Sequence, residues 1–284
     1  GVGKYSTGNM SKKDLLKLES VACPSAGSCG GQFTANTMAC VSEAIGLALP
    51  GSAGTPAVYE KRDRFATLSG LAVMNLIKKN IRPRDIVTRK SLENAAVVVA
   101  ASGGSTNAAL HLPAIANEAG IKFTLEDVTN ISKKTPYIAD LKPGGKYVAK
   151  DLYEIGGVPI LIKALLDGGY LHDDCLTVSG KTIGENHKNV IFPSNQKIIY
   201  KTSKPLSSSG GFVGLKGNLA PEGAIVKVAG MKRRKFKGKA KCFDGEPLAL
   251  DAVLKRKIKE GDVIVIRYEG PKGSPGMPEM LSTT

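Results

Sequence analysis

The sequence predicts an α/β protein in which a helix-rich α/β N-terminal region is followed by a mostly β, barrel-like C-terminal region, both incomplete. In the first two thirds of the chain, apolar residues recur at helical spacing between glycine-rich turns. After about Asn189, short runs rich in β-branched residues are divided by Gly and Pro, which is typical of strands. The length of 284 residues favours about two domains. We therefore predict domains over residues 1–190 and 191–284, with the boundary between Glu185 and Ser209.

Several helices are predicted in the N-terminal region. Ser11 precedes the first, and Asp14 stands three residues later, which is a weak capping-box pattern. A longer helix is predicted to begin at Thr34 and to end at Pro50-Gly51, because its apolar residues share one face. The short run Ile86-Val87 leaves room for a strand, as an α/β layer structure requires. Further helices are predicted over residues 59–79, 91–101, 106–119 and 158–166, the first of them with apolar positions at Leu68, Leu71, Met74 and Leu76.

The C-terminal region is predicted to be mostly β. Its candidate strands are residues 190–192, 197–200, 224–228 and 263–268. One helix is predicted near Leu248–Ile258. The last candidate strand leads into a loop rich in Gly and Pro, so it is placed to present the residues of that loop.

The chain is strongly basic, with 40 basic and 25 acidic residues and a formal net charge of +15. Much of the excess lies in residues 232–241, where Phe236 is the single aromatic residue. Such a run fits a polyanion partner, a solvated basic face or the attraction of anionic substrates. Because no zinc-finger or RNA-recognition pattern accompanies it, we expect no nucleic-acid partner and favour the last two interpretations. No apolar run approaches the ~20 residues that span a bilayer, so we also expect no membrane partner.

Five cysteines form an odd set without repeating spacing, which indicates a reducing compartment, the cytoplasm, rather than a secreted disulfide framework. Cys29 is the most informative, because glycines flank it and a predicted helix N-terminus follows it. Glycine permits close approach of the main chain, and a helix N-terminus favours a thiolate. Cys29 is therefore a candidate metal or cluster ligand, and a buried thiol in a tight turn is the alternative. The other four, Cys23, Cys40, Cys175 and Cys242, are interpreted as structural.

Two loops carry further candidate sites. In the Gly/Pro-rich loop over residues 269–281, the Glu279 carboxylate suits Mg²⁺, which prefers oxygen ligands. The alternative is that Glu279 begins a helix and complements its dipole. In residues 101–107, backbone N–H groups and small polar side chains could hold a carboxylate or a phosphate. For this second loop we favour a helix cap formed by Ser105 or Thr106.

Five motifs, in order along the chain, resemble those of the dihydroxy-acid dehydratase family. They are Gly-Ser-Cys-Gly-Gly-x-Phe-Thr-Ala-Asn-Thr-Met at 27–38, Gly-Gly-Ser-Thr-Asn at 103–107, Leu-Thr-Val-Ser-Gly-Lys-Thr at 176–182, Gly-Asn-Leu-Ala-Pro-Glu-Gly at 217–223 and Tyr-Glu-Gly-Pro-Lys-Gly-x-Pro-Gly-Met-x-Glu-Met at 268–280. The resemblance runs from end to end, and the chain is identified as an internal fragment of a member of that family. Two positions depart from the pattern: Gln32 stands where Met is usual, and Cys242 replaces a commonly apolar residue.

The resemblance implies an iron–sulfur and magnesium hydro-lyase. Cys29 would be one ligand of the iron–sulfur cluster, with 2Fe–2S favoured over 4Fe–4S, and Glu279 one ligand of Mg²⁺. The other cluster cysteines and Mg²⁺ ligands would lie upstream and the general-base serine downstream. No catalytic residue is therefore expected in this span, and the span alone is expected to be inactive. Residues 1–190 would belong to the iron–sulfur-binding α/β domain, and 191–284 to the C-terminal β-rich domain, of a cytoplasmic homodimer.

The implied reaction removes water from 2,3-dihydroxyisovalerate or 2,3-dihydroxy-3-methylvalerate and yields the 2-keto acids of valine and isoleucine biosynthesis. Mg²⁺ would stabilise the charge that grows on an enolate-like species, and the cluster would act as the Lewis acid for the C3 hydroxyl. A sugar-acid dehydratase of the phosphogluconate type, in the same superfamily, is the nearest alternative. A basic nucleic-acid-binding module and an inert scaffold are the alternatives from other classes.

Overall fold

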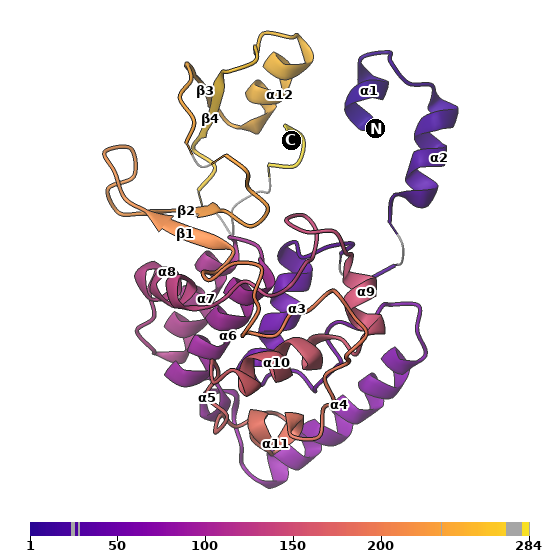
Figure 1. Cartoon of the computed structure of the whole chain (residues 1–284), viewed down its shortest axis with the longest axis vertical. Helices are drawn as coiled ribbons and strands as arrows, with labels where there is room; N and C mark the ends of the chain where they lie inside the picture. Colours follow the sequence, from indigo (N-terminus) through magenta and orange to yellow (C-terminus); the bar gives the residue numbers. More distant parts are fainter. Residues whose placement is uncertain (24–25, 28, 234, 271–279, 284) are drawn as a thin grey trace. The chain divides into compact units, whose positions relative to one another are not determined.

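The computed structural model describes residues 1–23, 26–27, 29–233, 235–270 and 280–283 (Figure 1). The chain forms two compact units. The larger one is Pro24–Met231, and the smaller one combines Gly1–Cys23 with Lys232–Thr284.

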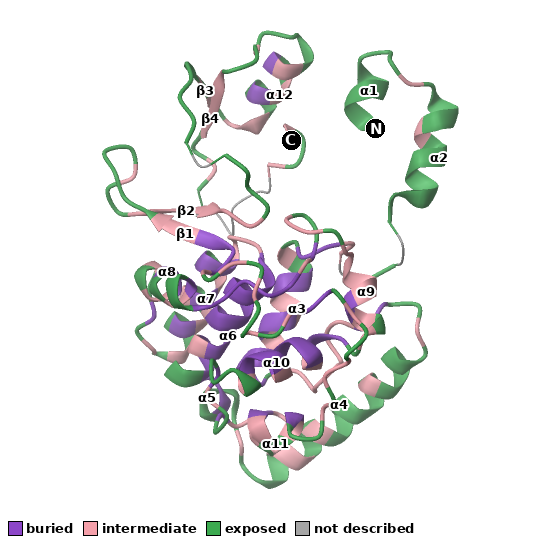
Figure 2. Cartoon of the chain, in the orientation of Figure 1, coloured by how far each residue is buried: buried purple, intermediate pink, exposed green. Residues whose placement is uncertain are grey.

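The larger unit is mainly helical and is built around one buried helix, α6 (Arg89–Ser102) (Figure 2). Eleven of the residues of α6 are buried, because α3, α7, α8 and α10 all pack against it. A helix covered on every side needs no polar face, so its long run of Ala and Val suits this position. The surrounding helices are α3 (Thr34–Ile45), α4 (Lys61–Lys78), α5 (Pro83–Ile86), α7 (Ala108–Ala119), α8 (Leu125–Lys134), α9 (Ala149–Glu154), α10 (Val158–Asp167) and α11 (Ile183–His187).

Local signals fix the ends of these helices. The Thr88 hydroxyl accepts a hydrogen bond from the Ser91 N–H at the start of α6, and Gly103 ends that helix with a φ of 61°. The helix α3 ends at Gly46, which has a φ of 94°, and not at Pro50-Gly51 as predicted. A residue in the left-handed conformation ends a helix, and Gly46 adopts that conformation before the chain reaches Pro50.

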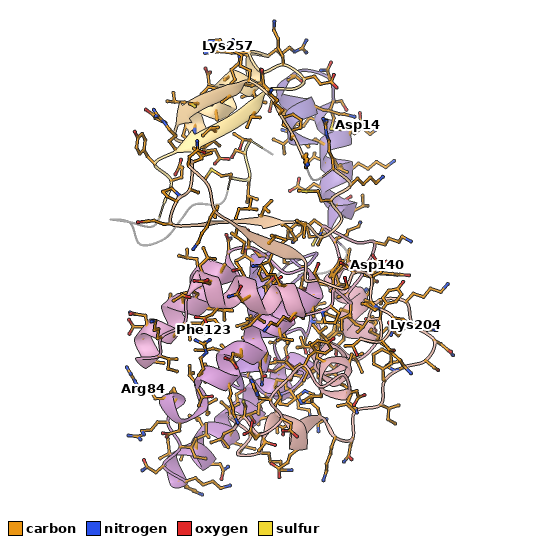
Figure 3. The ribbon with its side chains drawn as sticks, turned by 60° about the vertical axis from the view of Figure 1, so that its left-hand side comes forward. Asp14, Arg84, Phe123, Asp140, Lys204 and Lys257 are labelled. Carbon is orange, nitrogen blue, oxygen red and sulfur yellow. The ribbon has the colours of Figure 1, made fainter. Side chains whose placement is uncertain are left out.

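One antiparallel hairpin completes the larger unit. Strand β1 (Phe212–Leu215) pairs with β2 (Ala224–Lys227), and Phe212 lies opposite Lys227. The hairpin packs on α8, where the Ser132 hydroxyl donates to the Phe212 carbonyl at 2.7 Å. Just before α8 in the chain is Phe123, which is labelled in Figure 3; its ring is buried, and the Arg89 guanidinium carbon lies 4.7 Å from the ring centroid.

The smaller unit contains a parallel strand pair joined by a helix. Strand β3 (Ala240–Asp244) pairs with β4 (Val263–Arg267), and α12 (Glu246–Leu254) lies between them in the sequence. Parallel neighbours need such a crossover connection. Helices α1 (Val2–Ser6) and α2 (Lys12–Ala22) precede the larger unit in the chain. Ser11 caps α2 as predicted, since its hydroxyl accepts from the Asp14 N–H at 3.1 Å.

The prediction of a mixed helix and sheet protein is confirmed, as are the strands near 224–228 and 263–268 and the helix near Leu248–Ile258. The run Ile86-Val87, which left room for a strand, forms none, because Pro83 starts the short helix α5 there and Val87 ends it. Residues 190–192 and 197–200 were predicted as strands, but they belong to neither sheet. Val190 and Phe192 pack against the helical core instead. Among the described residues the strands form two two-stranded sheets and no closed barrel, so the barrel-like description has no support.

The longest helix, α4, keeps its predicted bounds within two residues, but its apolar positions are not a core face. No residue of α4 is buried, and Leu71 and Met74 are 63% and 53% exposed. Within the described residues, no helix is both long and apolar enough to cross a bilayer.

Candidate functional site

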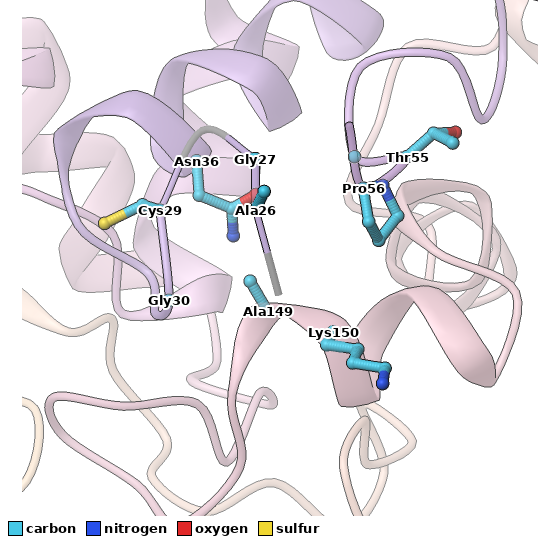
Figure 4. Close-up of a pocket in the computed structure, with 10 residues that line it drawn as sticks. Ala26, Gly27, Cys29, Gly30, Asn36, Thr55, Pro56, Ala149 and Lys150 are labelled. Atoms are coloured by element: carbon cyan, nitrogen blue, oxygen red, sulfur yellow. The ribbon is translucent and has the colours of Figure 1, made fainter. Parts of the chain in front are cut away.

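Cys29 lies half-buried in the turn that precedes α3, at the edge of a small pocket in the larger unit (Figure 4). Two main-chain hydrogen bonds hold this turn: the Gln32 N–H donates to the Lys142 carbonyl at 2.6 Å, and the Ala149 N–H to the Gly30 carbonyl at 3.0 Å. The pocket is lined by Ala26, Gly27, Cys29, Gly30, Asn36, Gly54, Thr55, Pro56, Ala149 and Lys150. Three segments far apart in sequence therefore meet at this pocket, and the Cys29 sulfur points away from its other lining residues (Figure 4).

The turn needs glycine at position 31. A Cβ atom there would lie 2.9 Å from the Lys142 carbonyl oxygen and 2.9 Å from a ring carbon of Phe33. Because a carbonyl oxygen in a fixed turn cannot move away as a flexible side chain can, any larger residue would shift the turn. The glycines that the sequence places beside Cys29 thus bring two main chains together.

The first turn of α3 presents free N–H groups beside Cys29. The helix begins at Thr34, Phe33 is its N-cap, and no side chain caps it. In the described part of the chain, the N–H groups of Ala35 and Asn36 have no acceptor. The positive end of the helix dipole and these donors favour an anionic ligand bound beside this turn.

A buried polar network supports this helix start. Gln32 is fully buried, and its Nε2 donates to the Ser102 hydroxyl at 3.0 Å and lies 3.6 Å from the Cys40 sulfur. Its Oε1 accepts from Asn36 Nδ2 at 2.6 Å. Asn36 is itself 3% exposed and lines the Cys29 pocket. The residue that departs from the family pattern is therefore fully hydrogen-bonded and fixes a side chain of the pocket.

The motif at 103–107 packs against the same helix start. The Ser105 N–H donates to the Thr37 hydroxyl at 2.9 Å, and Asn107 Nδ2 donates to the Thr34 hydroxyl at 2.9 Å. The helix α7 begins at Ala108 with Asn107 as its N-cap, so neither Ser105 nor Thr106 is the cap that we predicted. Carbonyls of residues 105–107 accept the first N–H groups of α7, which leaves none of these donors for an anion.

Glu43 is a buried carboxylate that sequence reasoning missed. It is 3% exposed, and its two oxygens accept from the N–H groups of Gly51 at 2.8 Å and Ala53 at 3.0 Å. Burial raises the pKa of Glu43 to about 7. The loop that it holds continues into the pocket wall and returns to the cysteine turn, where the Ala57 N–H donates to the Ala26 carbonyl at 3.0 Å.

The remaining cysteines divide into two kinds. Cys40 and Cys175 are buried as predicted, and desolvation raises their pKa values to about 12 and about 11, so both stay thiols. Cys23 and Cys242 are exposed, so burial does not support the structural interpretation of these two.

Glu279 falls outside the described residues, and its predicted role has no structural test. The other carboxylate of that loop, Glu269, is described: its Oε1 accepts from the Glu246 N–H at 2.7 Å, at the start of α12. It thus complements a helix N-terminus. Among the described residues, no group of three or more His, Cys, Asp or Glu side chains is placed to share a metal ion.

Comparison with known proteins defines the class. The chain belongs to the dihydroxy-acid/6-phosphogluconate dehydratase family, whose N-terminal domain model matches residues 1–186 and whose C-terminal domain model matches residues 197–284. The family resemblance predicted from the motifs is thereby confirmed.

Individual relatives are named for one of the two activities in the family description. The chain is 70% identical over 283 residues to the dihydroxy-acid dehydratase of Pelagibacter ubique, and 68% identical over 285 residues to that of Parvibaculum lavamentivorans. It is 68% identical over 283 residues to dihydroxy-acid dehydratase 2 of Bradyrhizobium diazoefficiens. Each alignment covers 100% of the chain but 49–50% of the relative, so the chain spans about half the length of these curated relatives.

Proposed function

We propose that the protein dehydrates 2,3-dihydroxy carboxylic acids to 2-keto acids, with 2,3-dihydroxyisovalerate and 2,3-dihydroxy-3-methylvalerate as substrates in valine and isoleucine biosynthesis. The observation that carries this proposal is identity of up to 70% along the whole chain with proteins named dihydroxy-acid dehydratase. The placement of Cys29 at the edge of a small pocket, just before a helix N-terminus, supports it. In this proposal residues 1–190 belong to the cluster-binding domain and 191–284 to the C-terminal domain.

Cys29 fits the role of one ligand to an iron–sulfur cluster. Cys29 is half-buried at the edge of a pocket and not in the apolar core, and the free N–H groups of Ala35 and Asn36 suit a negatively charged thiolate–cluster group. We assign the cluster as 2Fe–2S rather than 4Fe–4S, and Glu279 as a Mg²⁺ ligand, from the family resemblance. When bound, these groups would supply a Lewis acid for the leaving hydroxyl and a cation for the carboxylate end of the substrate.

The described residues contribute binding and positioning. The glycine turn lets the main chain approach a bound group closely, and the first turn of α3 stabilises negative charge there. Asn36, held by Gln32, presents a fixed amide to the pocket, and Lys150 adds a cation at its edge. The proton transfer from C2 is assigned to no residue of this chain, because the general-base serine is expected downstream.

Substrate competition tests the reaction. The protein purified without oxygen should form 2-keto acid from dihydroxyisovalerate at a kcat/KM at least ~100-fold above that for gluconate or 6-phosphogluconate, since a site built for one polar substrate rejects mismatched ones strongly. Turnover of 6-phosphogluconate alone would assign the protein to the other activity in the family name.

We further propose that the protein is a homodimer and that it is located in the cytoplasm. Sedimentation would test the first point and cell fractionation the second.

A further inference from the structure

The loop over residues 51–59 joins two sides of the Cys29 pocket. Its middle part, residues 54–56, forms one wall of the pocket (Figure 4). Just after this wall, the Ala57 N–H donates to the Ala26 carbonyl at 3.0 Å, in the segment that leads to Cys29. A main-chain hydrogen bond therefore links the pocket wall directly to the cysteine turn.

The end of the same loop is fixed on α9. The Tyr59 hydroxyl donates to Glu154 Oε1 at 2.7 Å, and the Tyr59 ring packs edge-on against Tyr153 with the ring centroids 5.2 Å apart. At the other end of α9, residues 149–150 also line the Cys29 pocket. A displacement of the loop would thus reach two walls of the pocket as well as the cysteine turn.

Glu43 anchors the start of this loop to α3. Its buried carboxylate accepts from the N–H groups of Gly51 at 2.8 Å and Ala53 at 3.0 Å, and the Gly54 N–H also stabilises its charged form. Among the described residues, no basic side chain pairs with this carboxylate. Burying a carboxylate without a cation is costly, and an apolar side chain would fill the same space without that cost. The carboxylate is therefore suited to holding the main chain of the loop and not to filling the core.

We propose that Glu43 is a positioning residue for Cys29, and that it acts through the 51–59 loop to hold the pocket wall and the cysteine turn in one geometry. This inference rests on the proposed function, in which Cys29 is a cluster ligand. Glu43 itself touches neither Cys29 nor the pocket, so its effect passes through the hydrogen bond between Ala57 and Ala26. A turn that is already held in place can accept a bound group without a rearrangement of its main chain.

Alkylation of the Cys29 thiol by iodoacetamide, in protein free of iron, measures how firmly the turn is held. The reaction is run above pH 7, where the Glu43 carboxylate is ionised, and is followed by mass spectrometry of the Cys29 peptide. The exposed Cys242 in the same sample is the internal reference. Glu43→Gln keeps the size of the side chain but replaces one acceptor oxygen with an NH₂ group. We expect it to raise the Cys29 rate about two- to tenfold, as for the loss of one hydrogen bond, and to leave Cys242 unchanged.

Ala57→Pro separates a positioning role from a purely structural one. This variant removes the N–H that links the loop to the cysteine turn, and residue 57 is on the surface. In the Ala57→Pro background, Glu43→Gln should change the Cys29 rate by less than about twofold, because the contact that transmits its effect is gone. A purely structural Glu43 would have the same effect in both backgrounds.

Ser132→Ala is the control for a general loss of stability. It also removes a buried hydrogen bond of the larger unit, the one to the Phe212 carbonyl, but α8 contributes no residue to the Cys29 pocket. It should leave the Cys29 rate within about twofold of the wild type. An unchanged Cys29 rate in Glu43→Gln, or an equal increase in the Ala57→Pro background, would overturn the inference. The iron content of the wild type tests the proposed function separately: its absence would refute the cluster, whereas the alkylation rates alone decide the role of Glu43.

Discussion

Replacing Gln32 with Met, the residue usual in the family, should destabilise this chain. Met would fill the space of Gln32 but would remove the acceptor of Asn36 Nδ2, whose hydrogen bond is 2.6 Å long in a site that is 3% exposed. The Ser102 hydroxyl would still donate to the Val99 carbonyl at 3.3 Å, so Asn36 Nδ2 is the one buried donor that loses its acceptor. An orphaned buried donor costs about 1–3 kcal/mol. We expect the free energy of unfolding to fall by that amount.

A double-mutant cycle measured by urea unfolding isolates this bond. Gln32→Met and Asn36→Leu should each destabilise the chain, but the double variant should lose less than their sum, because removing both partners leaves no buried donor unsatisfied. We expect a coupling energy of at least ~1 kcal/mol. Gln196→Met is the control for coupling: Gln196 has its own hydrogen bonds to Ile198 and Ile199, so its loss should simply add to that of Asn36→Leu. Additive losses within about 0.5 kcal/mol, or a Gln32→Met variant as stable as the wild type, would refute the reasoning.

Three further changes test the site. The pKa of Glu43 in the folded chain, about 7, lies above its ordinary value of 4.5, so the stabilisation by its protonated form is complete below pH 4.5 and is lost as pH rises through 7. The free energy of unfolding should therefore decline by up to about 3 kcal/mol over this range, and Glu43→Gln should abolish the decline. Gly31→Ala should lower the unfolding free energy by about 1–3 kcal/mol, because its methyl group meets the Lys142 carbonyl; an unchanged urea midpoint would contradict the turn geometry. Glu279→Gln should weaken the Mg²⁺ dependence of activity about tenfold or more whereas Glu269→Gln should not, and identical metal titrations would remove Glu279 as a ligand.

Local sequence patterns predicted the positions of the helices better than they predicted which helix faces are buried. The helix over 89–102 was predicted as 91–101 from its apolar run, and the cap at Ser11 from its spacing to Asp14. The periodicity of residues 59–79 also gave a helix, yet Leu71 is 63% exposed, because periodicity does not report whether a neighbour is present. The helix over 125–134 was missed, although Thr124 and Asp127 form a capping box that marks its start.

Only the part of the site that is formed by residues close together in the sequence could be predicted. The glycines around Cys29 and the helix start at Thr34 were visible as one motif. The partner of Gln32 at Ser102 is 70 residues away, and only the packing of α3 on α6 brings the two together. Glu43 lies on the buried side of α3, and its burial depends on a loop folding back over that helix. Such long-range pairings leave no periodic signal in the sequence.

Iron content is the most direct measure of the central claim that the Cys29 thiolate holds a cluster. The protein and its Cys29→Ser variant would be purified without oxygen, and iron per chain would be compared together with visible absorption, with Cys242→Ser as the exposed-thiol control. We predict that Cys29→Ser loses most of its iron and its brown colour while Cys242→Ser retains both. Equal iron in all three proteins would contradict the account.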